Sequence, residues 1–486
     1  MSKEIVNLEP KAVWENFYKL TQVPRPSKRE EKIQAFMMDF GKSLGLVTEK
    51  DSIGNVLIRK PATPGMENRK GIIFQGHLDM VPQKNSGTPH DFENDPIDAW
   101  IDGEWVRARG TTLGADNGIG VASAMAVLAS KDLVHGPLEA LFTCDEETGM
   151  TGALGLKPNW LKGDILLNMD SEEEGELYVG CAGGINADIE FEYDEVIVPD
   201  GVSPFKLVIS GLKGGHSGLD INLGRGNANK LIIRFLKYAT RELDVRLADI
   251  NGGGMRNAIP REAYAIVLIP DENIPLLRTA VARYESIYKF ELGAVEPTLR
   301  FTVEETEIPA SLIEERVQDD LIDAVYACPN GVIRMSDAMA GMVETSTNLS
   351  TIKSRKGVIF VKCLLRSSVD SAKDDLVEMV DSVFALGGAM VSFDGDYPGW
   401  KPNMDSQILA MMKEIYQHKF GRIPAVLGIH AGLECGILGA VYPNWDMISF
   451  GPTMRSPHSP DERVNIPSVQ KFWDFLIETL KNVPVK

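Results

Sequence analysis

The sequence predicts an α/β protein that combines a mostly parallel sheet in a discontinuous first domain with an inserted α+β domain. Apolar runs of strand length alternate with helix-length segments between residues 56 and 170, which is typical of a parallel sheet covered on both faces. From residue 187 the pattern changes to alternating polar and apolar strands and amphipathic helices. After residue 395 the α/β alternation returns. We therefore expect one domain from residues 1–186 and 396–486, and a second from 187–395.

The elements of the first domain follow from its periodicity and its turn residues. Residues 10–45 have apolar positions at helical spacing, interrupted by a Pro24-Arg25-Pro26 turn. A long polar excursion is expected over residues 83–109. The expected strands are IGNVLIRK, GIIFQGHLD, LEALFTCDEETG and DILLNMDSEEEG, and a helix is expected over GIGVASAMAVLAS.

The inserted domain contains two successive sets of strands and helices, in a comparable order. The first set includes FKLVISGLKGG and NANKLIIRFLKYATREL, and the second includes GVIFVKCLLRSS and SAKDDLVEMVDSVFALGG. The two halves share no evident sequence identity, so an internal duplication stays one alternative beside a single domain. The turn-rich residues 394–399 are the expected return point to the first domain.

Composition narrows the classes of function. A chain of 486 residues with 44% hydrophobic residues is expected to form two or three globular domains. A formal net charge of -19 argues against nucleic acid as a partner. The five cysteines are scattered, which argues against a disulfide framework or a thiolate metal site. The chain has no membrane-spanning run and no signal pattern at its N-terminus, so we expect no membrane partner and a cytoplasmic location.

The stretch GIIFQGHLDMVP carries the first candidate site residues. Residues two apart in a strand point the same way, so His77 and Asp79 are expected to project together where the strand ends. An imidazole is a good zinc ligand when a carboxylate orients it. Ligands of open α/β sheets bind outside the carboxyl ends of the strands. A structural histidine is the alternative interpretation of this motif alone.

Four further stretches place metal-ligand chemistry at a strand end or in a loop. A catalytic zinc takes three protein ligands and leaves a position for water. Two such ions need six contacts, and five side chains suffice if one carboxylate bridges the ions. Glu146 would then be free as a base, and Asp79 free to orient a histidine. The five expected ligands are His77, Asp116 in GADNG, Glu147 in FTCDEETG, Asp170 in LLNMDSEEE and His458 in RSPHSPDE.

These motifs, in this order, resemble the M20 family of dinuclear zinc peptidases, and the resemblance covers nearly the whole chain. It implies a catalytic zinc-peptidase domain and an inserted lid domain. It also implies that His77 and Asp170 bind one zinc, that Glu147 and His458 bind the other, and that Asp116 bridges both. The peptide bond after that aspartate is usually cis in the family.

The resemblance also implies a cofactor, a reaction and a substrate. Two Zn²⁺ ions per chain, with Mn²⁺ or Co²⁺ as substitutes, would lower the pKa of a shared water so that hydroxide is available near neutral pH. Glu146 would act as general base, and Asp79 would tune its zinc-binding neighbour. The expected activity is that of a metallo-dipeptidase on unblocked dipeptides, including Xaa-His dipeptides such as carnosine.

Further substrate-binding residues are implied in the inserted domain and beside it. His216 in GGHSG would donate to the oxyanion, and Arg366 in KCLLRSS would bind the free carboxylate of a dipeptide. Asn257 in MRNAIP and His430 in HAGLE match substrate-lining positions of the family, with turn and packing roles as equal alternatives. Family members pair through the lid, so a homodimer is one alternative, and a duplicated lid that replaces the partner is the other.

Two other functions remain open at this point. An M20-type tripeptidase or N-acyl amino acid deacylase would share the metal motif. A non-catalytic α/β protein could use the same acids to hold a structural cation. The spare carboxylate Glu146 disfavours the second alternative, because a structural site closes its coordination sphere and needs no base.

Overall fold

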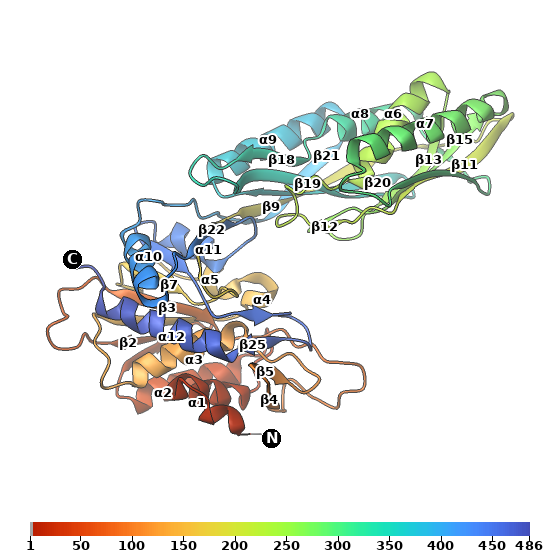
Figure 1. The fold of residues 1–486 in the computed structure, drawn as a ribbon. Coiled ribbons are helices and arrows are strands. Elements are labelled where there is room, and N and C mark those ends of the chain that lie inside the picture. Colours follow the sequence, from red (N-terminus) through yellow and green to blue (C-terminus); the bar gives the residue numbers. More distant parts are fainter. Residues whose placement is uncertain (1–2) are drawn as a thin grey trace. The chain divides into compact units, whose positions relative to one another are not determined.

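The computed structural model describes residues 3–486, which form two compact units (Figure 1). Unit 1 contains the residues up to 180 together with 402–428 and 433–486, and unit 2 contains 181–401 and the short segment 429–432. The chain therefore leaves unit 1 and returns to it, as expected for an inserted domain. No helix in the described residues is long and apolar enough to cross a lipid bilayer.

Unit 1 is built on an eight-stranded sheet with the strand order β1-β2-β6-β3-β7-β23-β8-β22. The four central strands, β6, β3, β7 and β23, run parallel to one another, whereas β1, β2 and β8 join in antiparallel fashion. The predicted α/β class is confirmed, and its parallel part is the centre of the sheet. The strands are β1 (Val47–Lys50), β2 (Val56–Lys60), β3 (Ile72–His77), β6 (Leu138–Thr143), β7 (Ile165–Asn168), β8 (Glu176–Cys181), β22 (Ala425–Ile429) and β23 (Asp446–Ser449).

The centre of this sheet is buried on both faces. Every residue of β3 and β6 is buried, as expected where apolar runs without alternation form parallel strands covered on both sides. The small residues of α3 let this helix pack on β3, and α1 packs on α3. The helices of the unit are α1 (Lys11–Thr21), α2 (Glu31–Ser43), α3 (Ala115–Ala129), α4 (Glu146–Gly149), α5 (Thr151–Leu154), α10 (Gln407–Phe420), α11 (Glu434–Val441) and α12 (Ile466–Lys481).

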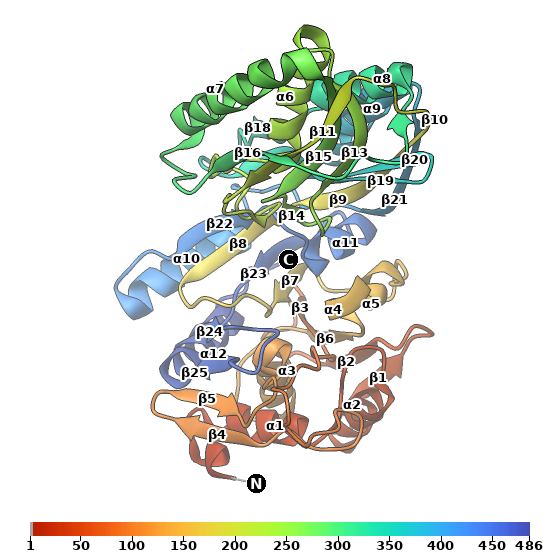
Figure 2. The ribbon, with the colours of Figure 1, turned by 90° about the vertical axis from the view of Figure 1, so that its right-hand side faces the viewer.

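The excursion over residues 83–109 is not polar loop throughout. Its second half forms the hairpin β4 (Ala99–Asp102) and β5 (Trp105–Ala108), whose turn contains Gly103 at a φ of 60°. This hairpin forms a four-stranded sheet with β24 (Met454–Arg455) and β25 (Arg463–Asn465), seen side by side in Figure 2. Pairing between β5 and β25 anchors the segment that carries His458.

Unit 2 is a nine-stranded sheet with four helices that lie along one side of it (Figure 1). Its pairings are antiparallel, and strands such as β9 and β11 alternate buried and half-exposed residues, as expected for a sheet with one solvated face. The strands along the sheet are β16 (Arg300–Glu305), β11 (Val202–Ser210), β15 (Ala263–Pro270), β13 (Arg246–Gly252), β19 (Val343–Arg355), β20 (Val358–Ser367), β9 (Gly183–Glu192) and β21 (Met390–Tyr397), with β18 (Gly331–Met335) paired to β19. The helices are α6 (Ala228–Glu242), α7 (Ile274–Leu292), α8 (Glu315–Ala327) and α9 (Asp370–Leu386).

Two small ribbons complete unit 2. The strands β10 (Glu195–Val196) and β17 (Leu312–Ile313) form one ribbon, and β12 (Gly215–His216) and β14 (Ala258–Ile259) form the other. In the second ribbon His216 pairs with Ala258. Two of the predicted substrate-binding residues, His216 and Asn257, therefore lie at neighbouring positions of one ribbon.

Candidate metal centre

The central strands of unit 1 bring four of the predicted residues to one edge of the sheet. His77 is the last residue of β3, Glu146 and Glu147 follow β6, and Asp170 follows β7. Because β6, β3 and β7 run parallel in register, their carboxyl ends lie at the same edge, where open α/β sheets bind ligands. The sheet topology, rather than any one motif, gathers these side chains.

Loops supply the other two predicted ligands. Asp116 lies at the start of α3 with non-helical backbone angles, φ -78° and ψ 112°, and the Asp116–Asn117 peptide bond is cis, as the family resemblance implies. His458 lies between β24 and β25 with a φ of 60°. A left-handed conformation is uncommon for a residue other than glycine, and such conformations cluster at functional sites.

The five predicted ligands converge in two groups that share one carboxylate. His77 Nε2 lies 3.0 Å from Asp116 Oδ1 and 3.3 Å from Asp170 Oδ1. His458 Nε2 lies 3.2 Å from the other oxygen of Asp116 and 2.9 Å from Glu147 Oε2. Within each group of three, the ligand atoms lie within 4.8 Å of one another. Each oxygen of Asp116 thus serves one group, which is the geometry a bridging carboxylate requires.

The two ligand groups contain more negative charge than positive charge, and this imbalance raises the pKa values of His77, His458 and Asp170. Burial opposes protonation of His77, but the charge of Asp170 and its other acidic neighbours raise the pKa of His77 well above the usual value. Hydrogen bonds with Asp116 and Glu147 raise the pKa of His458 to about 11. Burial and nearby carboxylates raise the pKa of Asp170 to about 7. Cations bound between these residues would reduce the repulsion among the carboxylates.

Asp79 holds the turn that carries both glutamates. Its Oδ1 accepts the backbone N–H of Glu146 at 3.0 Å, and its Oδ2 accepts that of Glu147 at 3.2 Å. Oδ1 also lies 3.3 Å from His77 Nδ1. Burial alone would raise the pKa of Asp79, but its hydrogen bond with His77, the charge of His77 and the backbone N–H of Glu146 lower that pKa to about 2. Asp79 therefore stays ionised and fixes both the ring and the turn.

Glu146 lies beside the two groups. Its carboxylate can approach His77 and Glu147 in a third group of ligand atoms within 4.8 Å. Burial, opposed by the charge of His77 and reinforced by the charges of Asp170 and Glu434, raises the pKa of Glu146 well above its usual value. A carboxyl group with a raised pKa is suited to proton transfer near neutral pH.

Sequence reasoning missed Glu434, a buried acid behind this edge of the sheet. It is the first residue of α11, its Oε2 accepts hydrogen bonds from Gln75 Nε2 at 2.5 Å and from Thr143 Oγ1 at 2.8 Å, and its Oε1 is buried without a hydrogen-bond partner. Burial raises the pKa of Glu434 to about 7, with a further contribution from the charge of Asp170 against an opposing one from His77. The available signal was Gln75, a polar residue inside the apolar run GIIFQGH, because a buried amide needs partners.

Unit 2 contains a second cluster, made of predicted substrate-binding residues. His216 Nδ1 accepts the backbone N–H groups of Gly218 at 3.1 Å and Leu219 at 3.0 Å. A ring nitrogen that accepts two such bonds carries no proton, so the neutral ring has its proton on Nε2. Burial and the charge of Arg366 lower the pKa of His216. His216 is therefore a neutral hydrogen-bond donor through Nε2.

Arg366 and His430 belong to the same cluster. Arg366 is buried on β20, donates from Nη1 to the Tyr397 hydroxyl at 3.1 Å, and leaves its buried Nε without a hydrogen-bond partner. His430 Nε2 lies 2.7 Å from Ser346 Oγ. Burial and the charge of Arg366 lower the pKa of His430 to about 3. The cluster thus combines one under-used guanidinium with two neutral imidazoles.

The glycine of the GGHSG motif allows the two histidine segments to meet. A Cβ on Gly218 would lie 1.9 Å from the backbone oxygen of His430, so only glycine fits there. Asn257 lies on the neighbouring loop, where its backbone oxygen accepts the N–H of Ser217 at 2.9 Å. Its side chain is exposed and makes no hydrogen bond within the described residues.

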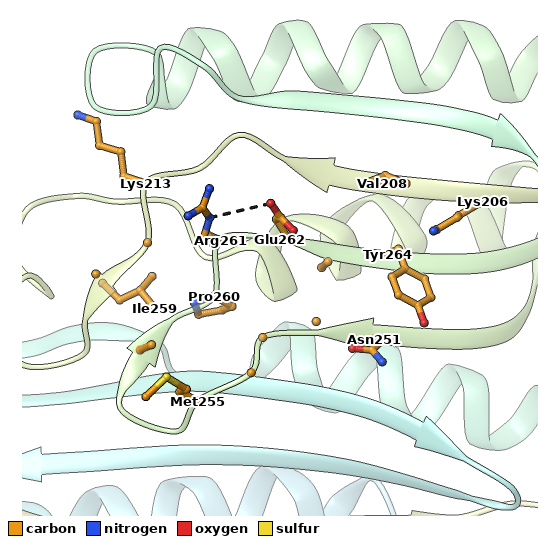
Figure 3. A pocket seen from close by; sticks show the side chains of 17 residues that line it. Lys206, Val208, Lys213, Asn251, Met255, Ile259, Pro260, Arg261, Glu262 and Tyr264 are labelled. Atoms are coloured by element: carbon orange, nitrogen blue, oxygen red, sulfur yellow. Dashed lines mark ion pairs between the residues drawn. The ribbon is translucent and has the colours of Figure 1, made fainter. Parts of the chain in front are cut away.

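Unit 2 also has a cavity of about 560 Å³, which borders the ribbon of β12 and β14 (Figure 3). Backbone of residues 214–215 and 252–254 lines it, and its one carboxylate among the described lining residues, Glu262, pairs with Arg261 at 4.0 Å. No histidine or cysteine lines the cavity. Among the described lining residues there is thus no cluster of metal-ligand side chains like the one at the edge of the sheet in unit 1.

Comparisons with known proteins agree with the motif order and the fold. A crystal structure of aminoacylhistidine dipeptidase from Vibrio alginolyticus matches with a TM-score of 0.97 and 51% identity, covering 100% of this chain and 99% of that chain. The cytosol non-specific dipeptidase of Escherichia coli (strain K12) is 50% identical over 483 residues, covering 99% of this chain and 100% of the relative.

More distant structures share the fold. A tripeptidase from Staphylococcus aureus matches with a TM-score of 0.56 and 15% identity, covering 98% of this chain and 99% of that chain. At this identity the likeness concerns the fold alone. The model of Peptidase family M20/M25/M40 matches residues 73–482, which include all the candidate ligands. The chain therefore belongs to Peptidase family M20/M25/M40.

Proposed function

We propose that this protein is a metal-dependent dipeptidase that hydrolyses the peptide bond of unblocked dipeptides, including Xaa-His dipeptides such as carnosine. The observation that carries the proposal is the pair of ligand groups that share Asp116, with Glu146 beside them as a spare carboxyl group. The similarity over nearly the full chain to a cytosol non-specific dipeptidase and to an aminoacylhistidine dipeptidase supports the choice of substrate class. The name of the first relative also supports a cytoplasmic location.

The residues at the sheet edge fit two divalent cations. Two imidazoles and three carboxylates suit Zn²⁺, and Mn²⁺ or Co²⁺ as substitutes. Asp170 Oδ1 is buried without a hydrogen bond, as an oxygen reserved for a cation would be. We assign His77, Asp116 and Asp170 to one ion and Asp116, Glu147 and His458 to the other. When bound, two such ions polarise a peptide carbonyl and lower the pKa of a water molecule between them.

Glu146 is the proposed general base. It would accept a proton from the attacking water at its carboxylate and pass that proton to the leaving amine. The pKa of Glu146 is raised by burial and by the charges of neighbouring acids, and a carboxyl group with a raised pKa holds an accepted proton better before passing it on. Asp79 would serve by holding the backbone of Glu146 and the ring of His77.

The cluster in unit 2 is proposed to recognise the free carboxylate of the substrate and to stabilise the oxyanion that forms during hydrolysis. Arg366 would bind the free carboxylate of the dipeptide, because a guanidinium with one hydroxyl partner keeps donors for a bidentate contact. His216 would donate from Nε2 to the oxyanion that forms on the scissile carbonyl. Asn257 and His430 are proposed to line the same substrate.

A rate survey tests the proposal. The metal-free protein is reconstituted with Zn²⁺, and initial rates are measured for dipeptides, tripeptides and N-acyl amino acids, each with and without a chelator. We expect dipeptides with free termini to be hydrolysed fastest and the chelator to abolish every rate. Preference for tripeptides or N-acyl amino acids would replace the proposed substrate class by another of the M20 type. Tight cation binding without any hydrolysis would favour a non-catalytic cation-binding protein.

A further inference from the structure

Two buried charged residues hold the loops that carry the candidate ligands without belonging to the ligand set. Arg25 is 3% exposed and Glu462 is 2% exposed, and neither belongs to a group of described residues that could hold a metal ion. Burying a charge is costly unless its partners satisfy it. The hydrogen-bond partners of these two side chains therefore show which parts of the chain they hold in place.

Glu462 binds a run of backbone donors that ends at the shared ligand. Its carboxylate accepts the N–H groups of the four consecutive residues 113–116, at 2.6 and 2.9 Å to Oε2 and at 2.7 and 3.2 Å to Oε1. The last of these donors is the N–H of Asp116 itself. Glu462 lies on the same connection between β24 and β25 as His458. One carboxylate thus joins the loop of Asp116 to the loop of His458.

Arg25 makes the corresponding connection to the third loop. Its Nη1 donates to the backbone oxygens of residues 78–79, at 3.0 Å each, and its Nη2 donates to the backbone oxygen of Gly114. The first contacts lie directly after His77, and the other lies two residues before Asp116. The planar, forked guanidinium suits this task, because it can donate to three carbonyls in fixed directions.

The glycines of the GADNG motif make room for this guanidinium. A Cβ on Gly114 would lie 2.6 Å from Arg25 Nη2, and a Cβ on Gly118 would lie 2.7 Å from the same atom. Gly114 also has a φ of 71°, which disfavours other residues. The glycines on both sides of the shared ligand therefore belong to the same arrangement as Arg25.

We propose that Arg25 and Glu462 are positioning residues that hold the loops of His77, Asp116 and His458 in the ligand geometry before any cation binds. This inference rests on the proposed function, because it assigns a task at the same metal centre. Without cations the carboxylates of the centre repel one another, and loops free to relax would move them apart. Residues that orient metal ligands contribute to metal affinity although they never touch the metal.

A merely structural pair would stabilise the fold and leave metal affinity unchanged. Glu139 provides a matched control in the same unit. It is 6% exposed, accepts the backbone N–H groups of residues 162–163 at 2.7 and 2.8 Å, and accepts a hydrogen bond from Arg59 Nε at 3.0 Å. Its chemistry resembles that of Glu462, but the loop that it holds carries no candidate ligand.

The first experiment compares Glu462→Gln with Glu139→Gln. In either variant the new amide –NH₂ faces backbone donors that an oxygen accepted before, so both variants should lose thermal stability. Zn²⁺ dissociation constants are measured on the metal-free variants by competition with a chelator of known affinity. We expect E462Q to lose about 10- to 100-fold in Zn²⁺ affinity, whereas E139Q keeps an affinity near the wild-type value. Arg25→Lys, which keeps the charge but not the fork, should resemble E462Q. Equal affinities in E462Q and E139Q would overturn the inference.

The second experiment uses only the wild-type chain, so that a variant that fails to fold leaves the inference testable. Amide hydrogen exchange is measured on the metal-free protein for residues 113–116. Protection comparable to that of β3 is expected if Glu462 holds this loop without cations, and exchange at the rate of an unstructured peptide would refute the inference. Failure of the proposed function is separate, since a wild-type chain that binds no divalent cation, or binds it without hydrolysing any peptide, would show it directly.

Discussion

The candidate-site histidines of the two units have opposite electrostatic environments. In unit 1, carboxylates raise the pKa of His77 well above its usual value and that of His458 to about 11. In unit 2, burial and the charge of Arg366 lower the pKa of His216, and they lower that of His430 to about 3. The same side chain is thus prepared for two tasks. Excess negative charge in unit 1 favours cations, and an under-used guanidinium with neutral donors in unit 2 favours a carboxylate and an oxyanion.

The two units also differ in the groups that hydrogen-bond to their buried charged side chains. In unit 1, backbone N–H groups hold the acids, as in the contacts of Asp79 with residues 146–147 and of Glu462 with residues 113–116. These backbone donors order both acids, and Asp79 contacts one ligand side chain as well, with its Oδ1 3.3 Å from His77 Nδ1. In unit 2, Arg366 has the Tyr397 hydroxyl as a partner and pairs with no carboxylate among residues 3–486. We infer that unit 1 is complete except for cations, and that the cluster in unit 2 is complete except for an anion.

Glu146→Gln tests the catalytic side of this comparison and should have the largest effect. The amide keeps the size of the side chain but cannot accept the proton of the attacking water. Turnover of dipeptides should fall about 100- to 10,000-fold, while the bound metal, measured by atomic emission, stays at the wild-type ratio. The neighbouring variant Glu147→Gln is the control, because it should lose metal as well as turnover. Retained turnover in E146Q would show that another group is the base.

Arg366→Met tests the anion-binding side. Removing a buried charged partner of a substrate carboxylate costs about 2 to 5 kcal/mol, a factor of roughly 30 or more in kcat/KM. The loss should appear for dipeptides with a free carboxylate and be much smaller for the corresponding amides, which lack the charge that Arg366 would bind.

The control for this prediction is Arg256→Met in the same unit. Arg256 already donates to a carboxylate of the chain, that of Asp188, at 2.7 Å, so its charge has an anionic partner without substrate. The ratio of rates for the free and amidated substrates should stay at the wild-type value in R256M. An equal loss for both substrates in R366M would remove Arg366 from carboxylate recognition.

Asp79→Asn tests whether a residue that is not itself a ligand positions the ligands of unit 1. Its effect on turnover should be smaller than that of the two preceding substitutions. The amide nitrogen would face a backbone N–H of residues 146–147 or the ring of His77, so the turn loses an acceptor. Residues that orient metal ligands typically contribute about 10- to 100-fold to activity or affinity. We expect that loss in kcat, with metal content largely kept.

Ser27→Ala is the graded control for Asp79. It removes the hydrogen bonds from Ser27 Oγ to Asp79 Oδ2, at 2.8 Å, and to the backbone oxygen of Met80, at 3.3 Å, but keeps the carboxylate of Asp79. Its effect on kcat should therefore be smaller than that of D79N. Loss of both ions together in D79N would show that Asp79 is needed for binding the cations themselves.

The sequence predicted the acids at the strand ends because two simple regularities apply there. Apolar runs without alternation indicated parallel strands, and parallel strands bring their carboxyl ends to one edge. His77, Glu147 and Asp170 therefore converge once the strand order is known. Asp116 and His458 lie in loops, where strand order predicts no meeting, so they entered the expected set through the count of ligands that two zinc ions need and then through the family resemblance.

The residues that sequence reasoning missed bind partners far away along the chain. Arg25 contacts backbone 53 residues later, and Glu462 contacts backbone 349 residues earlier. Neither contact involves a periodic pattern. Both are made to backbone atoms, which every residue type has, so the residue types of the partner segment do not indicate the contact. The Pro24-Arg25-Pro26 segment was therefore interpreted as a turn alone, whereas it also pairs with Met80 after β3. No local pattern in the sequence indicates that residues 429–432 belong to unit 2 while Glu434 belongs to unit 1.

The pH dependence of stability gives the smallest expected effect and tests the neutral state of His430. Its pKa is about 3 in the folded chain, against a usual value near 6.5. Between these values the unfolded chain binds the proton that the folded chain excludes, so the free energy of unfolding falls as the pH is lowered. From pH 7 to pH 5.5 this one group should contribute a loss of about 1 kcal/mol.

His430→Gln, compared with wild type by urea unfolding at both pH values, should lack this part of the loss. Ser346→Ala removes the hydroxyl that contacts His430 Nε2 at 2.7 Å but keeps the titrating ring, so its pH-dependent loss should persist. An H430Q chain with the full wild-type pH dependence would show that His430 is not held neutral, and the contrast between the histidines of the two units would then rest on His216 alone.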